Sequence, residues 1–515
     1  MKLHRFFCLS LLLCTVGTQA WAEIKLEAEK ATYSKCDIVS DKKYSGGKAL
    51  KLTDEKAKIT FEVDIKQKSK YTLYVGGDGI GGEKTINCSV NGGTAQFKLN
   101  GYKEVEVGTF MMDKGKNTVV ITPSWTWFDI DYLRLDVSQS SISFDISDKP
   151  VDANATEAAC KMYSFLYDNF GKKTISGMMT GDMGSANGNV TQHDDIKAVY
   201  EVSGKYPALV GLDFLFATGR TENEGWCKDY TKKAVELAKD TYRRGGFPAF
   251  TWHWHDPSYK TDDFYSDKMN MSISDALNID GSWNTASAIY KNIVHDIDVI
   301  ADYFLELQNE GMACIFRPLH EASGGWFWWG RNSKAEDFVK LYQLMFDEMT
   351  DVKGVHNVLW VWNAGTEDAD WNPGEDYYDI VSADIYNNFF DYSSNYPTFD
   401  KLKTLTGGKK IIALSENGPI PDIDKQMDDE AMWSWWMPWY QTWGGNFVNQ
   451  TSKEEWQKVM NDGHVVTLDD QKDWNSIEAL ITAPDQLDIF TLYGYKLKQA
   501  PAQGMFIRNG KKYMK

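Results

Sequence analysis

Cysteine is scarce in this chain, which has seven in 515 residues. Only five follow residue 22, and no two of these are separated by two residues, so a zinc site of the usual spacing is not indicated. The odd, scattered set also argues against a disulfide scaffold. A single disulfide between Cys36 and Cys88 is possible, and the sequence alone does not decide whether it forms.

Positive charge and long apolar runs are also lacking. The chain has 55 Lys and Arg against 73 Asp and Glu, a net charge of −18, and no long basic run. This balance argues against nucleic acid or an anionic membrane as a partner. After the N-terminus, no segment reaches the roughly 20 apolar residues that a membrane-spanning helix needs, so we expect no membrane span.

Aromatic residues, by contrast, are abundant. They make up 14% of the chain, with 20 Trp and 26 Tyr. Indole and phenol rings offer flat apolar faces with a polar edge, and the apolar C–H faces of sugar rings stack on such surfaces. The composition therefore favours a carbohydrate ligand.

The N-terminus has the pattern of a secretory signal peptide over residues 1–22. Basic Met1–Arg5 precedes an apolar core, Phe6–Val16, and the small-x-small site Ala20-Trp-Ala22. Cys14 lacks the small residue that a lipoprotein site needs before its cysteine, so lipidation is not expected. We expect export, to the periplasm, the cell surface or the medium.

Residues 23–137 contain short runs that alternate between apolar and polar residues. Glycine pairs, interpreted as turns, separate the runs (Gly46-Gly47, Gly76-Gly77, Gly81-Gly82 and Gly92-Gly93). This pattern predicts an all-β sandwich of the jelly-roll type. A polar connection, residues 138–150, follows and is too short for a long tether.

Three carboxylates of this first domain suggest a metal site. Glu27 and Glu29 alternate along a predicted strand, and Asp131 lies on the last predicted strand. Hard carboxylate oxygens suit Ca²⁺ better than a softer metal. The alternative is three solvated charges.

Residues 151–482 contain eight apolar runs that alternate with amphipathic helical stretches such as 230–243, 286–310 and 335–349. The runs are 173–178, 206–213, 246–253, 314–321, 357–362, 379–385, 410–416 and 432–437. Eight β-then-α units predict a (β/α)₈ TIM barrel. A doubly wound sheet is the structural alternative. The terminal residues 483–515 fall outside this count.

The ends of these runs carry polar, acidic and aromatic groups. They are Trp252-His-Trp-His255, His320-Glu321, Trp362-Asn363, Asp384-Ile-Tyr386, Ser415-Glu-Asn417 and Trp435-Trp436 with Trp439. In a TIM barrel the chemistry lies where strands end and loops begin. Each group alone could be structural, but their agreement favours one site at the barrel mouth.

The stretch Arg317–Gly330 is the most distinctive part of this set. A guanidinium, an imidazole and a carboxylate follow a buried run, and four aromatic residues stand within the next nine positions. Taken alone, it fits a buried ion pair at a strand end with the tryptophans in the core. At a barrel mouth, however, it fits an acid in a cleft walled by indoles, where burial keeps Glu321 protonated.

A second carboxylate, Glu416, ends the seventh run and is expected to face Glu321 across the mouth. A glycosidase typically uses two carboxyl groups that flank the glycosidic bond it cleaves. A separation of about 5–5.5 Å would make one of them a nucleophile and retain the anomeric configuration, whereas about 6.5–9.5 Å would invert it. The sequence leaves this distance open.

His320-Glu321 with Gly325–Gly330, together with Leu414-Ser-Glu416, resembles glycoside hydrolase family 26, a family of retaining barrel enzymes that are mostly endo-β-1,4-mannanases. The first domain, from Leu26-Glu-Ala-Glu29 to Asp131-Tyr-Leu133, resembles carbohydrate-binding modules of families 35 and 6. Those modules carry a structural calcium at such positions. In them loop aromatics contact sugar, for which Trp125, Trp127 and Tyr102 are candidates.

The resemblance implies a role for each matching residue. Glu321 is the general acid/base and Glu416 the nucleophile. Apart from the resemblance, the positive charge of a neighbour such as Arg317 is expected to lower the pKa of Glu416. The residues expected to bind substrate or hold the nucleophile are His320, Trp326, His253, Asp384, Tyr386 and Trp439. We expect no cofactor for catalysis, a β-mannan as the polysaccharide partner, and a monomer.

Two other functions stay open. Some family relatives act on β-1,3-xylan or mixed-linkage glucan, and a non-catalytic glycan-binding protein is a different class altogether. The end of the chain, residues 488–515, resembles the end of the sorting domains read by type IX secretion systems. A small terminal hairpin is the alternative for that segment.

Overall fold

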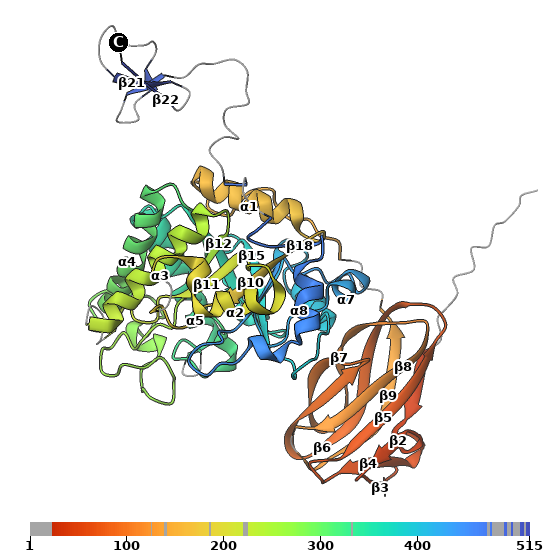
Figure 1. Cartoon of the computed structure of the whole chain (residues 1–515). Coiled ribbons are helices and arrows are strands. Elements are labelled where there is room, and N and C mark those ends of the chain that lie inside the picture. Colours follow the sequence, from red (N-terminus) through yellow and green to blue (C-terminus); the bar gives the residue numbers. More distant parts are fainter. Residues whose placement is uncertain are drawn as a thin grey trace, which may run out of the picture. The chain divides into compact units, whose positions relative to one another are not determined.

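The computed structural model describes residues 23–124, 126–138, 142–184, 187–219, 225–330, 333–470 and 474–475, and the backbone of four short strands beyond them. The expected signal peptide and Trp125 lie outside these residues. The chain divides near residue 142 into two compact units, seen in Figure 1. No helix among the described residues is long and apolar enough to cross a bilayer.

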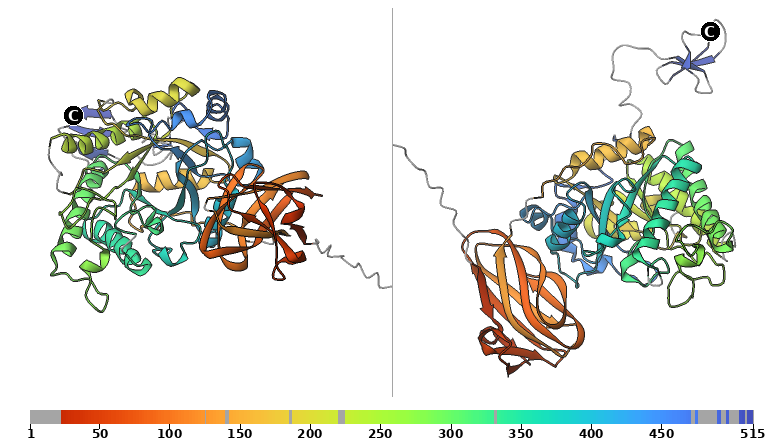
Figure 2. Two further views of the ribbon diagram at one scale, coloured as in Figure 1. Left: turned by 90° about the horizontal axis from the view of Figure 1, so that it is seen from below. Right: turned by 180° about the vertical axis from the view of Figure 1, so that it is seen from behind.

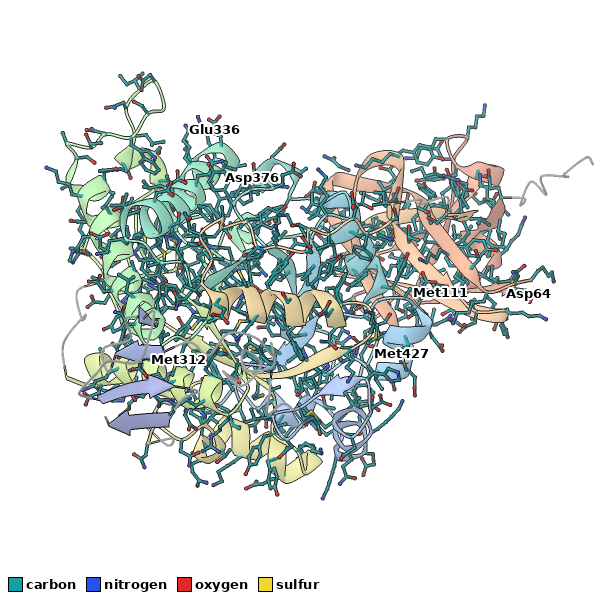
Figure 3. The ribbon with its side chains drawn as sticks, turned by 90° about the horizontal axis from the view of Figure 1, so that it is seen from above. Asp64, Met111, Met312, Glu336, Asp376 and Met427 are labelled. Carbon is teal, nitrogen blue, oxygen red and sulfur yellow. The ribbon has the colours of Figure 1, made fainter. Side chains whose placement is uncertain are left out.

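The N-terminal unit is an antiparallel all-β module of nine strands. They are β1 (Ile24–Glu27), β2 (Thr32–Ser34), β3 (Asp37–Ser40), β4 (Lys48–Leu52), β5 (Lys58–Ile65), β6 (Ser69–Val90), β7 (Gly93–Met112), β8 (Gly115–Pro123) and β9 (Phe128–Val137). The first part of β6 pairs with β9 and its last part with β8. One long strand thus belongs to both layers of the sandwich. Buried and solvent-facing side chains alternate along β5, and Asp64 is one of those that face solvent (Figure 3).

Two of the expected glycine turns are wrong, because Gly76-Gly77 and Gly81-Gly82 lie inside β6. A Cβ on Gly76 would come within 2.5 Å of the Tyr132 ring, and one on Gly77 within 2.5 Å of the Asp129 carbonyl. Glycine there admits the close approach of β9 rather than a chain reversal. The pair Gly92-Gly93 does mark the tight turn between β6 and β7.

Glu29 also differs from expectation. β1 pairs with β9 only as far as Glu27, and the chain then enters a 3₁₀ turn, Ala28–Lys30. Glu29 therefore does not share a strand face with Glu27. All five cysteines that follow residue 22 are unpaired, so the bond between Cys36 and Cys88 is absent.

The second unit contains a closed barrel of eight parallel strands, which confirms the predicted fold. Each of the eight predicted runs contains or overlaps one strand: β10 (Thr174–Met179), β11 (Leu209–Asp213), β12 (Phe247–Thr251), β13 (Cys314–Arg317), β14 (Val358–Asn363), β15 (Ile380–Ile385), β16 (Ile411–Asn417) and β17 (Trp435–Pro438). They pair in chain order, and β10 pairs with both β17 and β11, which closes the ring. A doubly wound sheet is thereby excluded.

Helices surround the strands, as the two views of Figure 2 show. They are α1 (Glu157–Asn169), α2 (Asp194–Ser203), α3 (Gly225–Arg243), α4 (Ala288–Asn309), α5 (Ala335–Asp347), α6 (Tyr396–Leu405), α7 (Ile423–Asp428) and α8 (Lys453–Met460). Only a 3₁₀ turn, Ala369–Trp371, joins β14 to β15. Met312, just before β13, is buried, while Glu336 on α5 is exposed (Figure 3).

Three further segments lie outside the eight barrel strands and the helices around them. In the expected connection 138–150, Ser147 accepts a hydrogen bond from the Tyr163 hydroxyl of α1 (2.8 Å), so this part of it packs on the barrel. Near the C-terminus, β19 (Ile489–Thr491), β20 (Lys496–Leu497), β21 (Met505–Arg508) and β22 (Lys511–Met514) form an antiparallel sheet. A strand pair, β18 (Val465–Val466) with β10, adds to the barrel sheet.

Candidate active site

Three carboxylates converge at the C-terminal ends of the barrel strands. Asp384 is on β15, Glu416 is on β16, and Glu321 stands in the loop after β13. One carboxylate oxygen of each lies within 4.8 Å of one oxygen of the other two. The pairing of β15 with β16 shifts register between Ala383 and Asp384, so that Asp384 pairs with Glu416. This irregularity aims both side chains at one point.

Arg317, at the end of β13, bridges two of the carboxylates. Its Nη1 donates to Asp384 Oδ2 at 2.9 Å, and its Nη2 donates to Glu416 Oε1. The guanidinium is buried between these two acids. Three acids and one fixed positive charge leave the cluster with excess negative charge, which favours retention of a proton.

Two of these carboxylates can keep that proton, Asp384 and Glu321, and burial raises the pKa of Asp384 well above its usual range. Burial, and then the negative charge of Glu416, raise the pKa of Glu321 above its usual range. Its backbone N–H donates to Asn363 Oδ1 (2.8 Å), and Leu319 and Glu321 both have left-handed backbone conformations, with φ of 51° and 53°. Such backbone conformations persist where neighbouring contacts hold them, often at functional sites.

Glu416 instead accepts hydrogen bonds on both oxygens. Besides Arg317, the hydroxyl of Tyr386 donates to Glu416 Oε2 at 2.5 Å. Burial raises the pKa of Tyr386 well above its usual range, so the hydroxyl keeps its proton and remains a donor. Two donors therefore fix the orientation of this carboxylate.

Two histidines lie beside the carboxylates, and their pKa values shift in opposite directions. His253 Nδ1 and Asp213 Oδ2 are 2.5 Å apart. Burial lowers the pKa of His253, but the charge and hydrogen bond of Asp213 outweigh it, and the net pKa is raised. Burial, aided by Arg317, lowers the pKa of His320 well below its usual range, so His320 is neutral. The two rings meet edge to face at 4.7 Å.

Aromatic residues border this group of polar side chains. The Trp439 ring, just after β17, is 6.0 Å from that of His253. Trp326 and Tyr386 expose 47% and 49% of their surface, and the Trp326 indole nitrogen is 2.8 Å from Glu321 Oε2. The structure therefore brings together all the catalytic and substrate-binding residues that the sequence analysis named. Flat apolar faces beside an acid and a carboxylate can bind and cleave a glycoside.

The comparisons with known proteins agree with this geometry. The model of glycosyl hydrolase family 26 matches residues 151–470. The chain belongs to this family. The model of carbohydrate binding module family 35 matches residues 24–138, the N-terminal module. Both resemblances seen in the sequence are confirmed.

Relatives share both parts. Mannan endo-1,4-beta-mannosidase from Thermothelomyces thermophilus is 32% identical over 467 residues, which cover 87% of this chain and 90% of the relative. Mannan endo-1,4-beta-mannosidase B from Piromyces sp is 31% identical over 461 residues, covering 87% and 76%.

Solved structures give the same picture. A GH26-CBM35 beta-(1,4)-mannanase from Podospora anserina superposes with a TM-score of 0.58 at 29% identity, over 88% of this chain and 99% of that one. A beta-mannanase from a symbiotic protist of the termite Reticulitermes speratus, complexed with gluco-manno-oligosaccharide, has a TM-score of 0.57 at 38% identity, over 64% and 99%.

Within this family 26 barrel, part of the expected cleft wall is wrong. Trp328 and Trp329 are fully buried. Their indole nitrogens donate to the backbone carbonyls of Trp254 and His320, at 2.7 and 2.8 Å. The Trp328 and Trp329 rings therefore pack in the core and stabilise the loop, and of the three tryptophans only Trp326 is exposed to solvent.

Asp213 is a site residue that the sequence analysis did not single out. It ends β11, so the same strand-end argument that found Glu416 would have found it. Asn363 was noted only as a strand end, yet it links two acids: besides receiving the Glu321 N–H, its Nδ2 donates to Asp384 Oδ1 at 2.9 Å. Contacts of this kind depend on the closed barrel.

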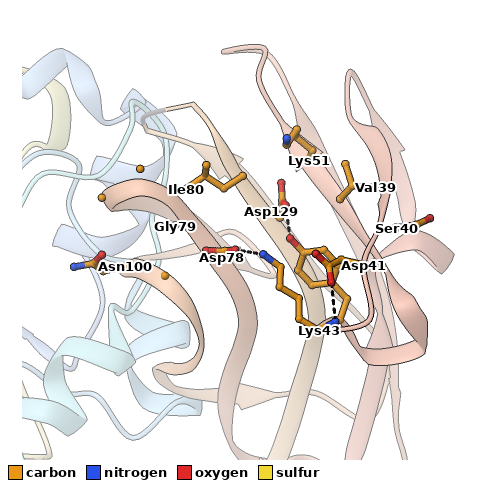
Figure 4. Close-up of a pocket in the computed structure, with 14 residues that line it drawn as sticks. Val39, Ser40, Asp41, Lys43, Lys51, Asp78, Gly79, Ile80, Asn100 and Asp129 are labelled. Atoms are coloured by element: carbon orange, nitrogen blue, oxygen red, sulfur yellow. Dashed lines mark hydrogen bonds and ion pairs between the residues drawn. The ribbon is translucent and has the colours of Figure 1, made fainter.

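The family 35 module has its own pocket, of about 570 Å³ (Figure 4). Charged groups line it: Lys43 pairs with Asp78, and the Tyr44 hydroxyl donates to Asp129 at 2.5 Å. Of the aromatic candidates for sugar contact, Trp127 is 58% exposed and Tyr102 donates its hydroxyl to Asp131, and neither lines this pocket.

Two of the three expected calcium ligands, Asp131 and Glu27, share Ser45 as a hydrogen-bond partner. The backbone N–H of Ser45 donates to Asp131 Oδ2 (2.9 Å), and its hydroxyl donates to Glu27 Oε1 (2.8 Å). The second oxygens Glu27 Oε2 and Asp131 Oδ1, and one oxygen of Glu29, are buried without a hydrogen-bond partner. Unpaired buried carboxylate oxygens are costly unless a cation satisfies them, so these residues fit Ca²⁺.

Proposed function

We propose that this protein is a retaining endo-β-1,4-mannanase, which hydrolyses internal mannosidic bonds of mannan, galactomannan or glucomannan through a covalent glycosyl-enzyme. The observation that carries the proposal is the approach of Glu321 and Glu416 oxygens to within 4.8 Å of each other in a family 26 barrel. So close an approach favours the spacing of about 5–5.5 Å typical of retaining enzymes over the about 6.5–9.5 Å of inverting ones.

Glu321 is the general acid and then the general base. In the first step its carboxylic acid donates a proton to the glycosidic oxygen as the bond to the anomeric carbon breaks. In the second step the resulting carboxylate takes a proton from the attacking water. Its raised pKa supports this role, because the acid form persists to higher pH than for an exposed glutamate.

Glu416 is the nucleophile that attacks the anomeric carbon. Arg317 and Tyr386 hold the two oxygens of its carboxylate, which orients the attack. Asp384 holds Arg317 from the other side at 2.9 Å. Two carboxylates and water suffice for this hydrolysis, so family 26 enzymes need no cofactor for it.

His253, His320, Trp326 and Trp439 line the sugar site before the cleaved bond. Because Asp213 occupies Nδ1 of His253, its Nε2 is free to meet a sugar hydroxyl. Trp439 supplies an apolar face for a sugar ring. The substrate is a neutral polysaccharide, so no charged partner has to be matched.

The direct test is the anomeric form of the first products. Proton NMR during hydrolysis of linear β-1,4-mannan should show the β-anomer before mutarotation, and the viscosity of galactomannan should fall early. An initial α-anomer would refute the covalent mechanism. Faster sugar release from β-1,3-xylan or barley glucan than from mannan would refute the assignment of β-mannan as the substrate.

We further propose that Glu27, Glu29 and Asp131 bind a structural Ca²⁺, that the protein is monomeric, and that it is exported. The unpaired carboxylate oxygens support the first of these, and the pattern of residues 1–22 supports export. Fractionation of cells that express the chain with and without residues 488–515 tests whether that segment is a sorting signal.

A further inference from the structure

Ser266 contacts the loop that carries the catalytic acid, although it belongs to a different part of the chain. It lies in the long connection between β12 and α4, residues 252–287, whereas Glu321 and Trp326 lie in the loop after β13. The side chain of Ser266 is buried. It has no part in the chemistry described above.

Two hydrogen bonds join Ser266 to the backbone on either side of Trp326. The Ser266 hydroxyl donates to the carbonyl of Gly325 at 3.0 Å, and the Ser266 N–H donates to the carbonyl of Trp326 at 2.8 Å. These carbonyls belong to the two peptide groups that flank the Trp326 Cα. Because each peptide group is planar, holding both of them fixes the backbone dihedrals of Trp326 and hence the direction in which its side chain leaves the chain.

The contact around Ser266 continues as a short antiparallel pairing. Tyr265 and Phe327 form a β-bridge, and the Trp328 N–H donates to the Phe264 carbonyl at 3.2 Å. The Tyr265 and Phe327 rings stack, with centroids 5.6 Å apart and planes 26° apart. The connection after β12 and the loop after β13 therefore form one paired unit.

The connection that carries Ser266 is itself anchored on α4. The side-chain amide of Asn292 donates to the carbonyl of Pro257 at 2.7 Å. The hydroxyl of Tyr259 donates to Oδ1 of Asp296, a buried residue of the same helix, at 2.6 Å. Ser266 therefore holds the backbone around Trp326 from a position that tertiary contacts fix before any ligand binds.

The indole of Trp326 depends on this backbone support because 47% of its surface is exposed to solvent, where no packing holds it. On its covered side the ring lies against Gly324, where an added Cβ would come within 2.2 Å of the ring. With the backbone and this contact both fixed, the indole N–H reaches Glu321 Oε2 at 2.8 Å.

We propose that Ser266 is a positioning residue, which acts on Glu321 by holding the indole N–H of Trp326 against its carboxylate. This inference rests on the proposed function, in which Glu321 is the general acid. The Trp326 bond stabilises the charged form of Glu321, and a misplaced indole stabilises that form less. The ionisable groups that face Glu321 from the surrounding elements are Arg317 on β13, Asp384 on β15, Tyr386 just after β15, Glu416 on β16 and Tyr265 beside Ser266.

The test is the pH profile of kcat/KM on linear β-1,4-mannan. Activity is lost as pH rises through the pKa of Glu321, and Ser266→Ala removes the hydroxyl bond to Gly325. The alkaline limb should therefore move to higher pH by about 0.5 pH unit, a fraction of the shift that loss of a whole hydrogen bond to a carboxylate brings. Ser272→Ala is the matched control, because Ser272 is a buried serine of the same connection whose hydroxyl pairs with that of Ser274. Its alkaline limb should stay in place.

A double variant shows whether Ser266 acts through the indole. In Trp326→Phe the donor is already absent, so adding Ser266→Ala should not move the limb further. A second, additive shift would overturn the inference, and so would a Ser266→Ala profile that is unchanged or is lowered equally at every pH. If the unaltered enzyme does not hydrolyse mannan, the proposed function fails instead. Infrared titration of the Glu321 carboxyl, taken as a difference against Glu321→Gln, then measures the same shift without turnover.

Discussion

The indole N–H of Trp326 donates a hydrogen bond to Glu321 Oε2 at 2.8 Å. This bond stabilises the carboxylate form of Glu321, while burial and the charge of Glu416 oppose that form and raise the pKa of the group. The proton affinity of Glu321 thus depends on a ring that is itself half exposed to solvent.

Replacing Trp326 by Phe should therefore change the pH profile. Loss of the donor raises the pKa of Glu321 further, and activity needs the protonated acid. The alkaline limb of kcat/KM, where activity is lost as pH rises through that pKa, should move to higher pH. Trp283→Phe, at a ring that contacts Tyr290, is the control. An alkaline limb that stays in place or moves to lower pH contradicts the assignment of Glu321.

Removing either catalytic carboxylate should abolish turnover and leave mannan binding intact. We expect kcat on mannan to fall by at least ~10³-fold in Glu321→Ala and in Glu416→Ala, with binding measured by calorimetry. Glu336→Ala, at an exposed site on α5, should behave like the unaltered enzyme.

An aryl β-mannobioside with a good leaving group separates the two roles. Its departure needs no proton, so Glu321→Ala should still release one equivalent of phenol in a burst, whereas Glu416→Ala should not. Normal hydrolysis of mannan by either variant would refute the mechanism.

Tyr386→Phe removes one of the two donors to the nucleophile. A hydrogen bond to a charged group contributes about 1.5–3 kcal/mol, so kcat/KM should fall roughly 10- to 100-fold. Tyr167→Phe, on an exposed side chain of α1, serves as the control. A change below twofold would show that Arg317 alone holds Glu416.

Calcium removal should destabilise the N-terminal module. A ligand that binds only the folded state at 100 times its Kd stabilises by about 2.7 kcal/mol, so EDTA should lower the Tm of the module's transition in scanning calorimetry by at least ~5 °C. Added Ca²⁺ should restore it.

Asp131→Asn should abolish the response to Ca²⁺, and Asp64→Asn, on the solvent side of β5, should leave it unchanged. A Tm that EDTA does not change, or a calcium response that persists in Asp131→Asn, would mean that the carboxylates are satisfied without a cation.

Much of the barrel could be predicted because its strands are buried on both faces. Parallel strands of this kind are near-continuous apolar runs, and each run contains or overlaps a strand of β10–β17. Strand ends then indicated Glu321 and Glu416. The module was harder, since a glycine pair such as Gly76-Gly77 has the same local signature in a turn as in a strand that another strand approaches closely.

By itself, the sequence determined the fold class, the family and the two carboxylates, since these follow from local periodicity and short motifs. Only the tertiary structure decided that Arg317 bridges Asp384 and Glu416, that Asp213 holds His253, and that Trp328 and Trp329 are core rather than cleft. The physical reason is that these contacts join residues on different strands. Their distances depend on the closure and register of the barrel, including the shift at Asp384, and no local pattern encodes that register.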